Sequence, residues 1–200
     1  MKPLVSNKLL ADYLLIIEPR KDLSDRIMEI KSGFAKTYQA NECTKSLPHL
    51  TLVRFKQSLY MEEKIRGKLR NICNHKSTLC IALSGYGSFP AHTIYINVNS
   101  RIAVQDIVRT IRTETQTMLK PNNDNKPHFI LEPHITIARQ LKSWQYEKGW
   151  RAFQHKNFSS SFIATNLLML RKQDDENHYS PIERFEFQNI PIPGKQTSLF

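Results

Sequence analysis

The sequence contains no apolar run long enough to cross a bilayer, and only three of its 200 residues are cysteine. A membrane-spanning helix needs about 20 consecutive apolar residues, so we expect none. Cys43, Cys73 and Cys80 are odd in number and lack paired CxxC spacing, which argues against a disulfide framework and a cysteine zinc site. This cysteine usage fits a reducing compartment, and we expect the protein to be cytoplasmic.

The first 19 residues place lysines before an apolar patch, an order that also occurs in signal peptides. Asp12 interrupts this patch, and no small-residue cleavage site follows it. We therefore expect residues 11–18 to form a first core strand.

Acidic residues are scarce as well: 18 Asp and Glu stand against 29 Lys and Arg, a formal net charge of +11. Such an excess favours polyanionic partners, nucleic acid above all. A solvated lysine-rich surface would give the same count, so charge alone does not decide. Hydrophobic content of 40% and charged content of 24% are ordinary for a soluble globular protein.

One seven-residue pattern occurs twice in the chain. The first copy is PHLTLVR at residues 48–54, and the second is PHITIAR at residues 133–139. Each copy alternates in period two and is rich in aliphatic residues, which predicts two equivalent strands. A short HxT pattern can arise by chance, but two copies in matching strand contexts argue for a shared function.

The spacing within each copy determines which side chains share a face. Successive side chains of a strand point to opposite faces, so His49 lies with Thr51, and His134 with Thr136. Two such strands side by side would direct two imidazoles and two hydroxyls into one groove. Histidine titrates near neutrality and suits general acid–base work, while threonine hydroxyls can hold a phosphate.

The arginine that ends each copy, Arg54 or Arg139, ought to lie on the face opposite the histidines if the strands stay regular. We therefore assign neither a catalytic role. His128, in PHFI, lacks the threonine of the motif, and we interpret it as a chance match.

The remaining elements follow from periodicity and breaker residues. We expect a helix capped by Asp22 or Ser24, and a hairpin joined by residues 84–90. Tyr86, Phe89 and Tyr95 in that hairpin are candidates for stacking on a base, although core packing would use the same residues. The full expectation is strands at residues 11–18, 49–55, 79–83, 93–98, 162–170 and 182–187, and helices at 23–34, 60–74, 103–119 and 143–154. Together they predict an α+β fold of two similar lobes that form a single domain over residues 1–190, followed by a tail at 191–200.

The two motifs, the opening strand, the hairpin and the closing segment at residues 179–185 resemble the two-histidine (2H) phosphoesterase superfamily. The closest resemblance is to its 2′-5′ RNA ligase and RNA 2′,3′-cyclic phosphodiesterase branch. This resemblance implies a bilobal fold of antiparallel sheets flanked by helices, with the active-site cleft between the sheets. It also implies hydrolysis of 2′,3′-cyclic phosphate RNA ends to 2′-phosphates, without metal or cofactor.

Site roles also follow from the resemblance. His49, Thr51, His134 and Thr136 would line the cleft as catalytic residues, and Tyr179 joins the three hairpin aromatics as a candidate substrate-binding residue. We take His134 as the general base and His49 as the acid, with the reverse open because the copies are nearly equivalent. Ligation in the reverse direction and the natural substrate also stay open. We expect a monomer that acts on RNA or nucleotides with no membrane partner.

The chain ends in GKQTSLF, which resembles the pentapeptide by which bacterial proteins dock on the DNA-polymerase sliding clamp. Gln196, Ser198, Leu199 and Phe200 match that pattern, whereas Thr197 stands where leucine is commoner. A tail that packs on the body of the protein is the alternative.

Two other hypotheses compete with the enzyme. A non-catalytic RNA-end or DNA-maintenance factor would use the cleft for binding alone, docked to a sliding clamp through the tail. A histidine metal site is disfavoured because the motifs offer only two good ligands.

Overall fold

The computed structural model describes residues 10–191. Within that range the chain forms nine strands, four α-helices and two short 3₁₀ helices. The strands are β1 Leu10–Ile17, β2 Leu50–Ser58, β3 Leu79–Phe89, β4 Thr93–Val98, β5 His128–Phe129, β6 His134–Ala138, β7 Ser159–Ala164, β8 Asn166–Gln173 and β9 Ser180–Glu186. The helices are α1 Lys21–Tyr38, α2 Glu62–Asn74, α3 Arg101–Thr115 and α4 Ser143–Phe153, with 3₁₀ turns η2 Asn41–Thr44 and η3 Leu59–Met61.

The strands form one curled sheet that consists of two halves. Its order is β7-β3-β4-β6-β2-β1-β8-β9, and the short strand β5 pairs with β2 beside β6. We call β2, β1, β8 and β9 the first lobe, and β7, β3, β4 and β6 the second lobe. The two lobes join where β2 meets β6, through the pair Leu50 and Ile135. Each copy of the repeated motif therefore lies on the inner edge of its lobe.

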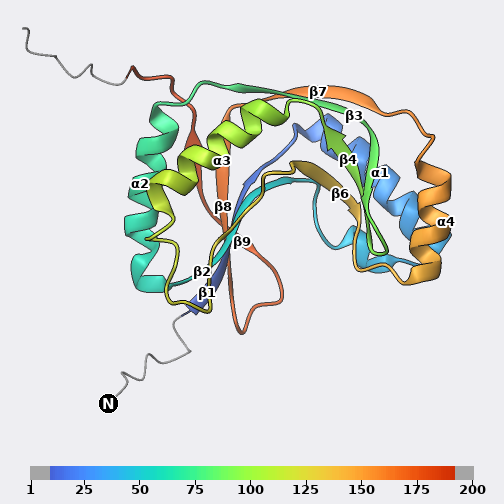
Figure 1. Cartoon of the computed structure of the whole chain (residues 1–200), viewed down its shortest axis with the longest axis horizontal. Coiled ribbons are helices and arrows are strands. Elements are labelled where there is room, and N and C mark those ends of the chain that lie inside the picture. Colours follow the sequence, from blue (N-terminus) through green and yellow to red (C-terminus); the bar gives the residue numbers. More distant parts are fainter. Residues whose placement is uncertain (1–9, 192–200) are drawn as a thin grey trace, which may run out of the picture.

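The helices cover the outer, convex side of the curled sheet (Figure 1). Helices α2 and α3 pack on the first lobe, through β9 and β2, whereas α1 and α4 pack on the second lobe, through β6 and β4. Helix α1 follows a strand of the first lobe in the chain yet covers the second lobe. The chain thus crosses between lobes repeatedly, and the concave face stays open.

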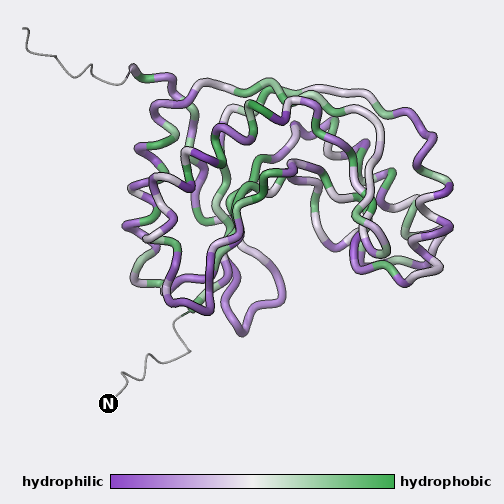
Figure 2. The backbone as a smooth tube through the Cα atoms, viewed as in Figure 1, coloured by the Kyte–Doolittle hydropathy of each residue, from purple (hydrophilic) through white to green (hydrophobic). Residues whose placement is uncertain are grey.

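Hydrophobic residues gather along the strands and the inward sides of the helices, while the outer helix turns and the β8–β9 connection are hydrophilic (Figure 2). The fully buried side chains include Tyr13, Ile27, Leu52, Ile65 and Ile81. No helix in residues 10–191 has the length and apolar character needed to traverse a bilayer.

The predicted α+β fold of two antiparallel lobes flanked by helices is confirmed, but several element boundaries were wrong. Residues 84–90 do not form a connecting loop, because β3 continues to Phe89 past a bulge at Gly85, whose φ of 63° absorbs the extra residue. The single strand predicted at 162–170 is two strands that break at Thr165 and pair in different lobes. Neither Asp22 nor Ser24 caps α1, since the N-cap is Arg20. The tail residues Gln196, Ser198, Leu199 and Phe200 lie outside the described residues.

Candidate active site

The pairing of β2 with β6 brings the two copies of the motif together around one point. The strands are antiparallel and Leu50 stands opposite Ile135, so the register places His49 opposite Thr136 and Thr51 opposite His134. Leu50 and Ile135 are buried on the convex side, which leaves all four motif residues on the concave face. The copies are therefore related by an approximate two-fold axis, and each histidine faces the threonine of the other copy.

The tautomer of each histidine is set by a backbone carbonyl two residues earlier. His49 Nδ1 lies 2.8 Å from the carbonyl oxygen of Leu47, and His134 Nδ1 lies 2.7 Å from that of Glu132. A carbonyl only accepts, so Nδ1 carries the proton and donates it. Nε2 is then the nitrogen of each ring that exchanges a proton with a ligand. A proline separates each carbonyl from its histidine and restricts the preceding residue to extended backbone, which orients that carbonyl.

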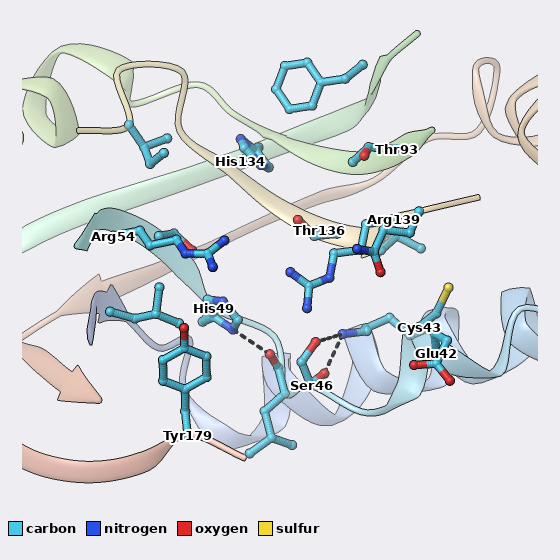
Figure 3. Close-up of a pocket in the computed structure, with 18 of the residues that line it drawn as sticks. Glu42, Cys43, Ser46, His49, Arg54, Thr93, His134, Thr136, Arg139 and Tyr179 are labelled. Carbon is cyan, nitrogen blue, oxygen red and sulfur yellow. Dashed lines mark hydrogen bonds between the residues drawn. The ribbon is translucent and has the colours of Figure 1, made fainter. Parts of the chain in front are cut away.

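The two arginines of the motif lie on the same face as the histidines, contrary to the prediction from regular alternation. In the pairing of β2 with β1, Leu52 has no partner residue. In the pairing of β6 with β4, Ile137 has none. Each unpaired residue is a β-bulge, which shifts the alternation by one position. Figure 3 shows the Arg54 and Arg139 guanidinium groups directed toward the space between the histidines. Sequence reasoning missed them because a bulge depends on the neighbouring strand.

The motif residues line a cavity of about 510 Å³ on the concave face. His49, Thr51, His134 and Thr136 all border it, together with both arginines. The wall also includes Lys31, Cys43 and Thr93, whose side chains are buried. A cavity with several cations and two imidazoles suits an anionic ligand such as a phosphate ester.

Two helices anchor the segments that lead into the motifs, and they do so with different side chains. Lys31 of α1 donates to the carbonyl oxygen of Ser46 at 2.5 Å, three residues before His49. Gln105 of α3 donates to the carbonyl oxygen of Leu131 at 2.8 Å, three residues before His134. The two contacts are equivalent under the approximate two-fold axis. One carries a charge and the other does not, so the two histidines sit in different electrostatic surroundings.

Burial and nearby charges shift the pKa values of these groups. Burial lowers the pKa of His49 and the cations Lys31 and Arg139 lower it further, while the Leu47 carbonyl and, more weakly, the Glu18 carboxylate oppose them. Burial also lowers the pKa of His134, but the Glu132 carbonyl and carboxylate both oppose that shift. Burial brings the pKa of Lys31 down to about 8, with Arg139 acting in the same direction. Burial thus biases both imidazoles toward the neutral form, while the charges around them differ: cations act on His49 and a carboxylate acts on His134.

The four candidate aromatic residues divide between the cavity and the core. Phe89 and Tyr179 line the cavity. Tyr95 packs on His134 with ring centroids 4.9 Å apart, and Phe89 meets the same imidazole edge-on at 5.0 Å. Tyr86 is on the other face of β3, where its ring packs against Phe153 and Phe158. The structure therefore brings three of these aromatics to the site and leaves Tyr86 half-buried against the core.

His128 was dismissed as a chance match, and the structure corrects this. It pairs with Arg54 across the β5–β2 ladder and lines the cavity. Among residues 10–191, no three histidine, cysteine, aspartate or glutamate side chains cluster as a metal site would require.

Comparisons with known proteins agree with this geometry. A family model for the 2′-5′ RNA ligase superfamily matches residues 19–176. A Geobacillus kaustophilus (strain HTA426) protein, provisionally named a phosphoesterase, is 26% identical over 137 residues, which cover 67% of this chain and 72% of that protein.

Solved structures share the fold. Escherichia coli LigT complexed with 3′-AMP superposes with a TM-score of 0.63 and 15% identity, covering 89% of this chain and 98% of LigT. The Thermus thermophilus protein TT0787 gives a TM-score of 0.63 at 13% identity, covering 88% of this chain and 98% of the other. Identities this low establish the similarity of fold alone.

Proposed function

This chain belongs to the 2′-5′ RNA ligase superfamily, and on that premise we propose that it is an RNA 2′,3′-cyclic phosphodiesterase. The observation that carries the proposal is the pair of histidines on one concave face, each with Nδ1 bound to a carbonyl and Nε2 left for a ligand. Two groups that titrate near neutrality on opposite sides of one phosphate suit in-line displacement at phosphorus. The LigT complex with 3′-AMP supports a nucleotide ligand.

Water attacks phosphorus in the proposed reaction, and the bond from phosphorus to the 3′-oxygen breaks. One histidine takes a proton from the attacking water, and the other gives a proton to the departing 3′-oxygen. The products are a 2′-phosphate and a free 3′-hydroxyl. Thr51, Thr136 and the two motif arginines donate hydrogen bonds to the phosphate oxygens as negative charge accumulates on them.

The charges around the site support His49 as the base and His134 as the acid. A general base starts neutral, and Lys31 with Arg139 favours neutral His49. A general acid starts protonated, and the Glu132 carboxylate favours protonated His134 against the larger effect of burial, which lowers its pKa. This is the reverse of the direction we took from the sequence, in which the two copies are nearly equivalent.

Hydrolysis of a short RNA that ends in a 2′,3′-cyclic phosphate, with a chelator present, tests the proposal. We expect a 2′-phosphate product, and we expect His49→Ala and His134→Ala each to lower kcat by about 10²- to 10⁴-fold, the usual contribution of a general acid or base. The matched control is His155→Ala, because His155 is exposed and lies apart from the cavity residues. Circular dichroism establishes that each variant is folded.

Two results would count against the enzyme. Undiminished turnover by a folded variant that lacks both histidines would remove them from the mechanism. Salt-sensitive RNA binding without any product would instead favour a non-catalytic RNA-end factor.

A further inference from the structure

Cationic side chains continue from the cavity across the concave face of the first lobe. The ladder of β5 with β2 places His128 beside Arg54. One row further along, the ladders of β1 place Asp12 between Lys56 of β2 and Lys172 of β8. Residues directly opposite in an antiparallel ladder share a face, so these side chains form one surface. We call Arg54, Lys56, His128 and Lys172 the basic stripe.

The single carboxylate of Asp12 offsets only part of the positive charge of the basic stripe. Asp12 lies 3.9 Å from Arg54 and 3.6 Å from Lys56, distances too long for hydrogen bonds. The Arg54 and Lys56 side chains are 60% and 43% exposed. Three permanent cations thus face one acid, and their donors are accessible to a ligand from solvent.

An aromatic ring stands at the junction of the stripe and the catalytic cavity. Tyr179 lines the cavity, and the Lys172 ammonium lies 5.8 Å from its ring centroid. Figure 3 places this ring on the His49 side of the cavity. Aromatic side chains next to cations are the usual platform for single-stranded nucleic acid, because every base has a stacking face.

The opposite end of the cavity is less suited to a polyanion. Beyond Arg139 the lining side chains are the buried Lys31, Cys43 and Thr93 and the exposed Glu42 and Gln140. Lys31 donates to the Ser46 carbonyl and is shielded from solvent. Glu42 forms an ion pair with Lys45 at 2.6 Å, so this end of the cavity presents no exposed excess of positive charge to a phosphodiester. A chain of phosphates that leaves the histidines is therefore attracted toward the basic stripe.

We propose that the basic stripe binds the phosphodiester backbone on the 5′ side of the cyclic end, so that the substrate is an RNA strand and not a mononucleotide. This rests on the proposed function, since the cyclic phosphate must lie between the histidines. The cyclic phosphate is the 3′ terminus, so the whole remaining strand lies on its 5′ side. Lys56 and Lys172 are two strands apart, about 10 Å, a span that lets each contact a different phosphate.

The test compares uridine 2′,3′-cyclic phosphate with a pentanucleotide that ends in the same group. We expect the wild-type protein to have a higher kcat/KM for the pentanucleotide. The double variant Lys56→Gln/Lys172→Gln should move the ratio of the two kcat/KM values toward one. The charge-matched control is Lys36→Gln/Lys64→Gln, two exposed lysines on the convex helices, which should keep the wild-type ratio.

A binding measurement tests the stripe independently of turnover. The probe is a 5′-fluorescein pentanucleotide with a terminal 2′-phosphate, followed by fluorescence anisotropy over a salt series. Each lost phosphate contact should reduce the slope of log affinity against log salt by about 0.7 for a single strand. The double variant should therefore lose affinity and slope, and the control should lose neither.

The outcomes separate the two proposals. Equal kcat/KM for mononucleotide and pentanucleotide, with affinity and salt slope unchanged in the double variant, would overturn the stripe while leaving cyclic phosphate hydrolysis intact. Failure to hydrolyse either compound would overturn the proposed function, and the anisotropy series would still decide whether the stripe binds RNA.

Discussion

At the residue scale, one pair of equivalent positions contributes to the difference between the two histidines, beside Arg139 and Glu132. Lys31 and Gln105 hold corresponding carbonyls ahead of the two motifs, but only Lys31 brings charge. A lysine that is only 2% exposed is unusual, because burial disfavours the ammonium, and its retention here requires a compensating contact. Two nearly identical motifs thus acquire different electrostatic surroundings from the helices behind them.

Lys31→Gln would give the first motif the same anchor as the second, keeping a donor for Ser46 while removing the charge. The Lys31 cation lowers the pKa of His49, so its removal should raise that pKa. If neutral His49 is the base, the acid limb of the kcat/KM profile then moves to higher pH. Activity should fall most below neutrality and least above pH 8, where the wild-type Lys31, with its pKa of about 8, has itself lost charge.

Lys31→Arg serves as the control that keeps a permanent cation, and its acid limb should stay low. If Lys31→Gln left the acid limb in place and shifted the alkaline limb instead, His49 would be the acid and the assignment would reverse.

At the element scale, matching bulges in β2 and β6 bring the arginines to the histidine face. A separate close contact supports His134 from the β3–β4 hairpin. Gly87 of β3 stands opposite Tyr95 of β4, and a Cβ at Gly87 would come within 2.5 Å of the Tyr95 ring. The same ring packs on His134. The glycine therefore makes room for the aromatic support of a catalytic imidazole.

Gly87→Ala should displace Tyr95 and, through it, His134. Small displacements of a catalytic group cost up to about 10²-fold in rate, so we expect kcat to fall on the order of 10- to 100-fold. The comparison variant is Gly149→Ala in α4, where a Cβ would press on the buried Phe34 ring. That change should lower the free energy of unfolding by about 1–3 kcal/mol, as overpacking does, and spare kcat in folded protein. Wild-type kcat in Gly87→Ala would show that the Tyr95 contact does not position His134.

At the scale of the whole molecule, the two lobes share one sheet and exchange covering elements. One strand pair joins them directly, while the chain crosses repeatedly, so that α1 leaves the first lobe to cover the second. A helix that follows a strand of one lobe thus covers hydrophobic residues of the other lobe. The cavity lies between the lobes and exists only when both are folded.

We expect the lobes to unfold together. Both tryptophans, Trp144 and Trp150, lie on α4 of the second lobe, so their fluorescence reports that lobe, whereas far-UV circular dichroism reports both. In a urea titration the two signals should give one coincident transition. Separate midpoints would mean that the lobes are independent units and would contradict a single domain.

Local patterning was sufficient to predict the main features. Alternating aliphatic residues after proline predicted both motif strands, and the apolar stripes predicted all four α-helices, because such periodicities reflect one buried face. The spacing of His49 with Thr51, and of His134 with Thr136, placed them together since a strand repeats every two residues. These properties belong to each segment alone.

Features that depend on a neighbouring segment could not be read from the chain. The bulges that turn Arg54 and Arg139 toward the histidines are mismatches between a strand and its partner. The break at Thr165 arises because β7 and β8 pair in different lobes. Lys31 has the sequence context of an exposed helical residue, yet docking of α1 against the second lobe buries it beside His49. Pairing and burial are relations between distant residues, and these relations make two nearly identical motifs into two unlike halves of one site.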